Sequence, residues 1–322
     1  MPFPYEYISD ERVKQLLTWP KAFEVVERAM ASVSTGDAFQ TTRKVVPVGN
    51  QPNLLFVMPG YLKDPKYGAL VSMVFTKYGG NPKRQPPLPI IHADMAYMDE
   101  ETGVTKAVIA CNEAMEWVTA AASVTATKHL HGPDCGKPNR ILAVIGAGHQ
   151  GRIHAIAFQK YFNFAEVRIW NRTASKAENV AGELNKKFNK TVFTASPTVE
   201  ECVRNADVII TATDAVQTLV KYPWVKKGAH INAIGVSPFA TELDADTYKA
   251  SKIYCDYKEG AEAELKHISA LGGKFEGQVG DVITGKIPAP SVDDTSIFQS
   301  LGMPMEYCAI ARLIYDLHKG KK

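Results

Sequence analysis

The sequence lacks the patterns that mark secreted, membrane-spanning or metal-binding proteins. Its five cysteines are scattered along 322 residues without a Cys-x-x-Cys pair, so we expect free thiols in a reducing compartment and no zinc site. No run of about 18 apolar residues occurs, and the first residues show no basic segment followed by an apolar one. The chain is therefore predicted to be a cytoplasmic protein with no membrane partner and no bound metal.

A strong excess of one charge is also missing. The 37 lysines and arginines nearly balance the 34 aspartates and glutamates, and the net charge of +3 is too small and too dispersed for a nucleic-acid-binding surface. The length predicts two domains, and the hydrophobic share of 45% is ample for their cores. These features are typical of a cytosolic enzyme.

Residues 141–151, ILAVIGAGHQG, are the most informative segment. A strand-length apolar run turns into Gly146-x-Gly148-x-x-Gly151 and then into a helical pattern, and a second strand is predicted over 166–170. This arrangement places a dinucleotide pyrophosphate at a helix N-terminus. We predict a Rossmann-type, doubly wound α/β nucleotide domain that binds its cofactor through Gly146, Ala147, Gly148, His149, Gln150 and Gly151.

The residues after the second strand bear on the choice of cofactor. An NAD site usually has an acidic side chain here for the ribose 2′-hydroxyl, whereas a 2′-phosphate needs cations and hydroxyl groups. The chain has Asn171, Arg172 and Thr173 and no carboxylate, which favours NADPH over NADH. The alternative is that Arg172 is an ordinary solvated loop arginine.

The α/β alternation continues toward the C-terminus, with strands predicted at 191–194, 207–213, 230–235 and 252–256. Ligands of such sheets bind beyond the carboxyl ends of the strands. Residues at these ends are therefore predicted near the cofactor or substrate, with ordinary loop caps as the alternative. They are Thr211, Ala212, Thr213, Gly235, Val236 and Ser237, together with Leu301 and Gly302 further along the chain.

The first part of the chain does not show the α/β alternation of the second part. Residues 8–34 predict a helical opening interrupted by Pro20, and short β-rich segments follow between 42 and 110, separated by glycine and proline clusters. They predict an α+β domain with a mostly antiparallel sheet. An alanine-rich helix over 114–130 and a turn-rich linker over 131–138 then lead to the nucleotide domain.

Six segments spread over nearly the whole chain carry a likeness to one protein family: residues 43–48, 57–59, 144–148, 166–173, 228–233 and 298–302. Through them the chain resembles the ornithine cyclodeaminase and mu-crystallin family. The resemblance implies a homodimer in which residues 1–130, completed by the C-terminal helix 303–322, form the substrate-binding and dimerisation domain. It also implies that residues 131–302 bind NADPH and that hydride passes between the nicotinamide and a carbon–nitrogen bond. Residues 168–173 and 228–233 are most similar to the mu-crystallin branch of the family.

The chain departs from the family among the residues expected to hold the substrate. Family members that act on amino or imino acids are similar in presenting three cations. Only Arg43 matches this set, because Met73 and Val118 stand at the other two positions. A buried carboxylate is costly unless it is paired. We therefore expect a cyclic imine that lacks a conventionally bound α-carboxylate, in a pocket formed by Arg43, Met58, Met73 and Val118.

The resemblance also bears on catalysis. Ser237 stands where the cyclodeaminase has an aspartate, which disfavours deamination and leaves imine reduction, for which a proton donor is needed. Candidate donors are Ser237, directly or through water, and Lys77, Tyr78 and His92. The alternative for Lys77 and Tyr78 is a solvated strand edge, and for His92 it is a satisfied core or edge histidine.

The leading hypothesis is an NADPH-dependent reductase of a cyclic imine. Two alternatives remain open. One is a ketimine reductase for substrates that bear a carboxylate, anchored by Arg43 with Lys44 or Arg84 as a further cation. The other is a catalytically silent protein that binds NADPH and a small hydrophobic ligand.

Overall fold

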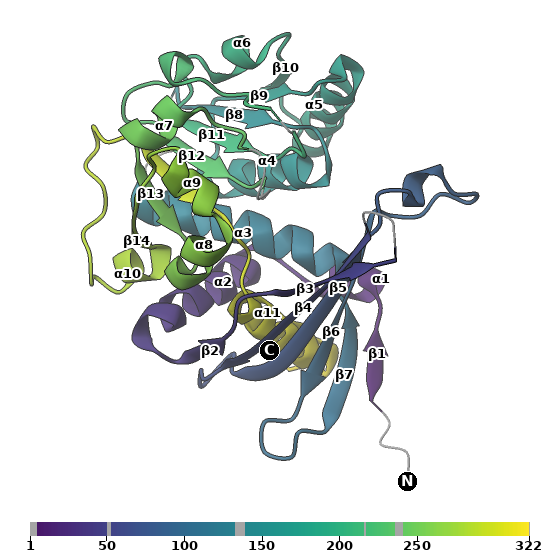
Figure 1. Ribbon diagram of the computed structural model, residues 1–322. Helices are drawn as coiled ribbons and strands as arrows, with labels where there is room; N and C mark the ends of the chain where they lie inside the picture. Colours follow the sequence, from purple (N-terminus) through teal and green to yellow (C-terminus); the bar gives the residue numbers. More distant parts are fainter. Residues whose placement is uncertain (1–4, 50–52, 133–138, 216, 236–240, 322) are drawn as a thin grey trace. The chain divides into compact units, whose positions relative to one another are not determined.

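The computed structural model describes residues 5–49, 53–132, 139–215, 217–235 and 241–321, which form two compact units (Figure 1). Unit 1 comprises Met1–Val118 and Gly302–Lys322, and unit 2 comprises Thr119–Leu301. The first division falls inside the long helix α3 (Asn112–Leu130), whereas the boundary predicted at residue 130 coincides with the end of that helix.

A mostly antiparallel sheet forms the centre of unit 1, which confirms the predicted fold class. Its strand order is β1-β7-β6-β5-β4-β2, and β3 also pairs with β4. Among the described strands of unit 1, β1 and β7 form the one parallel pair. The strands are β1 (Glu6–Ile8), β2 (Ala38–Gln40), β3 (Lys44–Val48), β4 (Asn53–Leu62), β5 (Ala69–Lys77), β6 (Ile91–Met98) and β7 (Thr105–Ala110).

Helices cover one face of this sheet. In β5 the side chains of Ala69, Val71 and Met73 are buried and alternate with more exposed ones, as expected for a sheet with one covered face. Helix α11 (Pro304–His318) packs against β4, β5 and β6 and against α2 (Trp19–Thr35). A Cβ atom on Gly60 of β4 would lie 2.4 Å from the Met305 side chain, so glycine permits this close approach.

The opening of unit 1 follows the predicted helix signals. Ser9 caps α1 (Asp10–Leu16) by accepting a hydrogen bond from the Arg12 backbone N–H. Pro20 then lies in the first turn of α2, where its missing N–H costs no hydrogen bond. The predicted interruption at Pro20 is therefore the start of a second helix. A short 3-10 helix, η1 (Asn81–Lys83), lies in the connection between β5 and β6.

Unit 2 contains a parallel sheet with the order β10-β9-β8-β11-β12-β15-β13-β14. The order reverses between β8 and β11, which is the switch point of a doubly wound sheet. This confirms the predicted Rossmann-type architecture. The strands are β8 (Ile141–Ile145), β9 (Glu166–Trp170), β10 (Phe193–Ala195), β11 (Val208–Thr211), β12 (His230–Ala233), β13 (Lys252–Cys255), β14 (Phe275–Gln278) and β15 (Ser296–Gln299).

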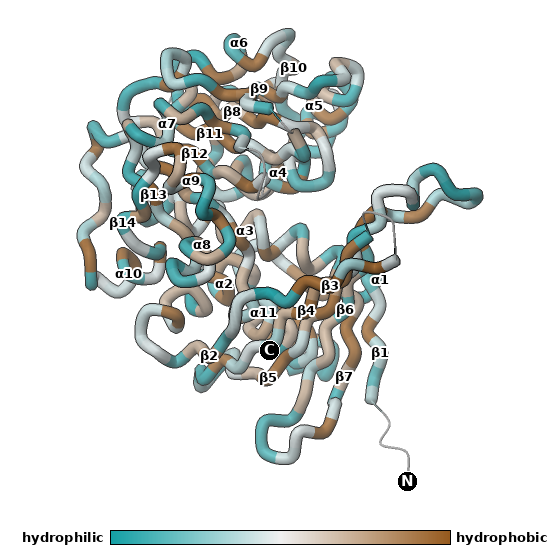
Figure 2. The backbone as a smooth tube through the Cα atoms, viewed as in Figure 1, coloured by the Kyte–Doolittle hydropathy of each residue, from teal (hydrophilic) through white to brown (hydrophobic). Residues whose placement is uncertain are grey.

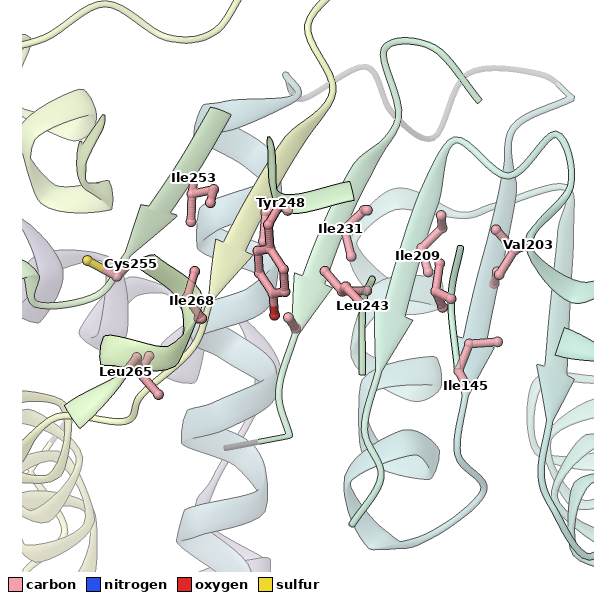
Figure 3. Close-up of a cluster of buried hydrophobic side chains, with 14 of the residues drawn as sticks. Ile145, Val203, Ile209, Ile231, Leu243, Tyr248, Ile253, Cys255, Leu265 and Ile268 are labelled. Carbon is pink, nitrogen blue, oxygen red and sulfur yellow. The ribbon is translucent and has the colours of Figure 1, made fainter. Parts of the chain in front are cut away.

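The helices of unit 2 connect these strands. Besides the second part of α3, they are α4 (His149–Phe162), α5 (Ala174–Phe188), α6 (Val199–Val203), α7 (Ala245–Ala250), α8 (Lys258–Glu264), α9 (Lys266–Ala270) and α10 (Val279–Ile283), with the 3-10 helix η3 (Tyr222–Trp224). Hydrophobic segments run along the central strands (Figure 2). On one face of the sheet, Ile209, Ile231, Leu243 and Tyr248 belong to one buried cluster (Figure 3).

Candidate cofactor and substrate sites

The glycine loop at the end of β8 has the geometry that a bound pyrophosphate needs. Gly146 has a positive φ of 118°, and a Cβ atom there would lie 2.4 Å from the Ala212 carbonyl oxygen. A Cβ atom on Gly151 would lie 1.8 Å from the Gly146 carbonyl oxygen, so only glycine lets α4 pack this closely. Gly148, in contrast, faces open space, since a Cβ atom there would meet nothing within 4 Å.

The N-terminus of α4 is available to an anion. Gly148 is its N-cap, no side chain caps it, and its first turn contains no acidic residue. The first backbone N–H groups of a helix lack partners within the helix, and together with the helix dipole they attract negative charge. The glycine loop therefore fits the pyrophosphate of a dinucleotide, with Gly148 leaving room for the phosphates.

Asn171 fixes this loop from the end of β9. Its Oδ1 accepts a hydrogen bond from the Ala147 N–H at 3.1 Å, and its Nδ2 donates to the Thr173 carbonyl at 3.0 Å. The Gly146 N–H donates to the Trp170 carbonyl at 2.8 Å. The side chain of Asn171 thus holds the glycine loop and the turn into α5 together.

The start of α5 offers cationic and hydroxyl groups. Arg172, Thr173 and Ser175 are exposed there. The first turn of α5 contains no acidic residue, and the Thr173 side chain makes no capping hydrogen bond. An anion at the N-terminus of α5 could therefore accept hydrogen bonds from these side chains, and no carboxylate in the first turn would repel it.

The carboxyl ends of β11 and β12 are joined by a glutamate that sequence reasoning missed. Glu242 is 4% exposed, and its Oε1 accepts hydrogen bonds from the Thr213 N–H at 2.7 Å and the Thr213 hydroxyl at 2.6 Å. Its Oε2 accepts from the Gly235 N–H at 2.9 Å. Burial raises the pKa of the Glu242 carboxyl, while the hydrogen bonds from Thr213 and Gly235 act against that rise.

Of the other predicted cofactor residues, the structure locates some at strand ends, whereas others lie outside the described residues. Thr211 is the last residue of β11, and the Ala212 N–H donates to the Ile145 carbonyl at 2.9 Å, which ties it to the end of β8. The Leu301 N–H donates to the buried Asp256 carboxylate at 2.8 Å, and Gly302 has a positive φ of 76°. Val236 and Ser237 lie outside the described residues.

The predicted substrate residues belong to unit 1. Met58 and Met73 are cross-strand neighbours in β4 and β5, and both are buried on the face that α11 covers. Val118 in α3 is 1% exposed. Arg43, just before β3, is half-buried, and its Nη2 donates to the Gly302 carbonyl at 3.4 Å. Apolar side chains thus occupy both positions where the resemblance led us to expect cations.

Two of the proton-donor candidates of unit 1, Lys77 and His92, lie on opposite faces of the sheet. Lys77 is four residues beyond Met73 in β5 and therefore shares its face. His92 pairs with Thr76, so it points to the other face, where it is exposed. The structure therefore places Lys77, but not His92, on the methionine face.

Several expected absences concern the described part of the chain. Cys111, Cys202, Cys255 and Cys308 are buried free thiols there, and Cys135 lies outside it. Within the described residues, no group of three or more His, Cys, Asp or Glu side chains is arranged to hold a metal ion. In the same residues we find no helix whose length and apolar character would let it cross a membrane.

The fold and the glycine loop define a dinucleotide-binding protein of the Rossmann class. The chain belongs to the ornithine cyclodeaminase/mu-crystallin family, whose model matches residues 7–322. It is 36% identical over 295 residues to the ketimine reductase mu-crystallin of Rattus norvegicus, covering 90% of both proteins. The family resemblance inferred from the sequence is thereby confirmed.

Solved structures agree with this assignment. The Delta(1)-pyrroline-2-carboxylate reductase of Thermococcus litoralis, in complex with NADH and L-proline, is 27% identical with a TM-score of 0.89, over 98% of both chains. An archaeal alanine dehydrogenase dimer with bound NAD is 26% identical with a TM-score of 0.88, over 98% of this chain and 96% of that one. A nicotinamide dinucleotide is therefore the class of cofactor that the site takes.

Proposed function

We propose that the protein is an NADPH-dependent reductase of a cyclic imine, acting on the carbon–nitrogen double bond. The observation that carries the reaction class is the open glycine loop of unit 2 in a family whose named relatives include ketimine and Delta(1)-pyrroline-2-carboxylate reductases. The bound nicotinamide supplies the hydride. The residues of this chain bind and orient the reactants and deliver a proton to the imine nitrogen.

The preference for NADPH rests on the start of α5. A 2′-phosphate at this end would meet the Arg172 guanidinium and the exposed hydroxyls of Thr173 and Ser175, and no carboxylate of the first turn would repel it. An NADH-selective site would instead be expected to present an acidic side chain to the ribose hydroxyls.

The substrate proposal rests on the apolar positions in unit 1. Met73 is fully buried among the side chains of the covered face and Val118 nearly so, and neither can pair with a carboxylate. Arg43 is the remaining cation of the three that the family resemblance predicts. We therefore propose a substrate without a conventionally bound α-carboxylate, with Ser237 or Lys77 as the proton donor; His92 would have to act from the other face of the sheet.

A second candidate function is reduction of a ketimine that carries a carboxylate. It is favoured by the half-buried guanidinium of Arg43 and by the L-proline complex of the Thermococcus litoralis relative. A third candidate is an NADPH-binding protein without turnover, which the apolar substrate positions would also suit.

Matched substrates separate these functions. Oxidation of NADPH should be measured with 1-piperideine and piperideine-2-carboxylate, and with 1-pyrroline and pyrroline-2-carboxylate. We expect the neutral imines to give the higher kcat/KM. A strong preference for the acids would instead identify a ketimine reductase, and tight NADPH binding without turnover on any of the four would identify a silent binder.

We also propose that the protein is a cytoplasmic homodimer that uses unit 1 as its interface. Val46 and Val74 lie on the sheet face opposite Met73, and they are 49% and 38% exposed. The archaeal alanine dehydrogenase is a dimer of the same fold. The buried free thiols of the described residues suit a reducing compartment.

Charge introduced on this face tests the dimer. Val46→Glu should shift the sedimentation coefficient from dimer to monomer, because an unpaired carboxylate would be buried between the copies. Val292→Glu is the matched control, since Val292 is 91% exposed in unit 2. A Val46→Glu protein that remains as dimeric as the control would refute this interface.

A further inference from the structure

A buried carboxylate joins two loops at the carboxyl edge of the nucleotide-binding sheet. The Glu242 side chain accepts hydrogen bonds from donors just beyond the ends of β11 and β12, namely the Thr213 N–H and hydroxyl and the Gly235 N–H. Thr213 is 29 residues from Glu242 in the sequence, and Gly235 is 7 residues from it. Glu242 therefore adds a side-chain link between two segments just beyond the point where β11 and β12 stop pairing, at Thr211 and Ala233.

Glu242 is itself held firmly. Its backbone carbonyl accepts hydrogen bonds from the Leu219 and Val220 N–H groups, each at 2.9 Å. The next residue, Leu243, pairs with Val220 and is buried in the same hydrophobic cluster as Ile231 of β12 (Figure 3). The Glu242 carboxylate thus links Thr213 and Gly235 to a backbone segment that is anchored in the hydrophobic core.

The joined loops lie beside the glycine loop. The Cβ position of Gly146 is blocked by the Ala212 carbonyl and lies 3.1 Å from the Thr213 side chain. A Cβ atom on Gly235 would lie 2.6 Å from the Glu242 carboxyl carbon, so the absence of a side chain lets the carboxylate reach the Gly235 N–H. Glu242, Thr213 and Gly235 therefore form one hydrogen-bonded cluster, here called the clasp, beside the switch point between β8 and β11.

We propose that Glu242 is a positioning residue for the nicotinamide half of the cofactor. In an open parallel sheet the ligand lies outside the carboxyl ends of the strands at the switch point. The clasp sets Thr213 and Gly235, which follow β11 and β12, at that edge, whereas the groups expected to hold the adenosine 2′-phosphate follow β9 on the other side of β8. This inference rests on the proposed function, because it assumes that NADPH is the cofactor.

The two halves of the cofactor provide the test. Dissociation constants of NADPH and of adenosine 2′,5′-bisphosphate, which lacks the nicotinamide half, should be measured by calorimetry for the wild-type protein and for Glu242→Gln. The amide keeps the size of the side chain, but it turns an NH2 group toward an N–H donor and opens the clasp. We expect NADPH to bind at least about tenfold more weakly and the bisphosphate to bind within about twofold of wild type.

Asp207→Asn is the matched control. Asp207 is also 4% exposed and lies in the same unit at the amino end of β11, where its carboxylate accepts from the Ile141 N–H at 2.8 Å and pairs with Lys226. Its loss should lower the melting temperature and leave both dissociation constants unchanged. If Glu242→Gln does not fold, Gly235→Ala serves instead, since its methyl group would displace the carboxylate. We expect this variant also to bind NADPH more weakly while its affinity for the bisphosphate stays unchanged.

The outcomes separate the two proposals. If Glu242→Gln weakens NADPH and the bisphosphate equally, or weakens neither, Glu242 has only a structural role and the inference is wrong. If the wild-type protein binds no NADPH, the proposed function is wrong, and the inference is wrong as well because it assumes that cofactor. Selective weakening of NADPH supports both.

Discussion

Acid should destabilise unit 2 through a histidine that is buried without a charge. His154 of α4 is fully buried; its Nδ1 lies 2.7 Å from the Gln150 carbonyl and its Nε2 lies 3.0 Å from the Ser123 hydroxyl. A carbonyl can only accept, so Nδ1 carries the proton and Nε2 accepts from Ser123. Burial lowers the pKa of His154 to about 4, and the hydrogen bond to Gln150 opposes this only in part.

The direction of the effect follows from this lowered pKa. Above pH 6.5 both the folded and the unfolded protein hold His154 neutral, so nothing is lost. Between pH 6.5 and about 4 the unfolded chain binds a proton that the folded chain does not, so the free energy of unfolding decreases as the pH is lowered. Below about pH 4 both states are protonated. Between pH 7.5 and pH 4.5 we expect the loss from this histidine to be about 2–3 kcal/mol.

The variant His154→Phe isolates this contribution. The ring is kept, the titrating group is removed, and the Ser123 hydroxyl retains the Thr119 carbonyl at 3.2 Å as an acceptor. Urea unfolding of both proteins at pH 7.5 and pH 4.5 gives the four free energies. Burial also lowers the pKa of His131, to about 4, and this second contribution cancels in the difference. A wild-type protein that loses no more stability than the variant over this range would refute the reasoning.

Two further predictions concern ligand selection. Arg172→Ala should raise the KM for NADPH roughly 10- to 100-fold, the range expected for losing a charge-assisted hydrogen bond, with little change for NADH; steady-state kinetics with both cofactors measure it, and equal effects would show that Arg172 does not contact the 2′-phosphate. Met73→Lys should raise the kcat/KM ratio of piperideine-2-carboxylate to 1-piperideine by roughly tenfold or more, because it places a cation on the buried methionine face. Met73→Leu is its control, and a ratio that stays at the control value would remove Met73 from the substrate site.

Local sequence patterns were sufficient for much of the fold. The apolar run, glycines and helical pattern of residues 141–151 predict β8, the glycine loop and α4 where the structure has them. The β-rich segments between residues 42 and 110 correspond to β3 to β7. These predictions succeed because strand alternation, helix periodicity and glycine requirements act within about ten residues.

Long-range pairing could not be predicted in the same way. Strand β15 inserts between β12 and β13, and neither β14 nor β15 was predicted as a strand. The opposite orientation of Lys77 and His92 follows from the register of β5 with β6, which the sequence of either strand leaves open.

The sequence by itself determined the family and the nucleotide-binding motif, and it led to the prediction that two substrate cations are missing, because each depends on which residue stands at a given position. Tertiary structure alone decided that Glu242 joins Thr213 and Gly235 and that Met58 lies beside Met73. The physical reason is that a hydrogen bond or a cross-strand contact forms between groups brought together by the whole sheet, and no local periodicity records which distant residues will meet.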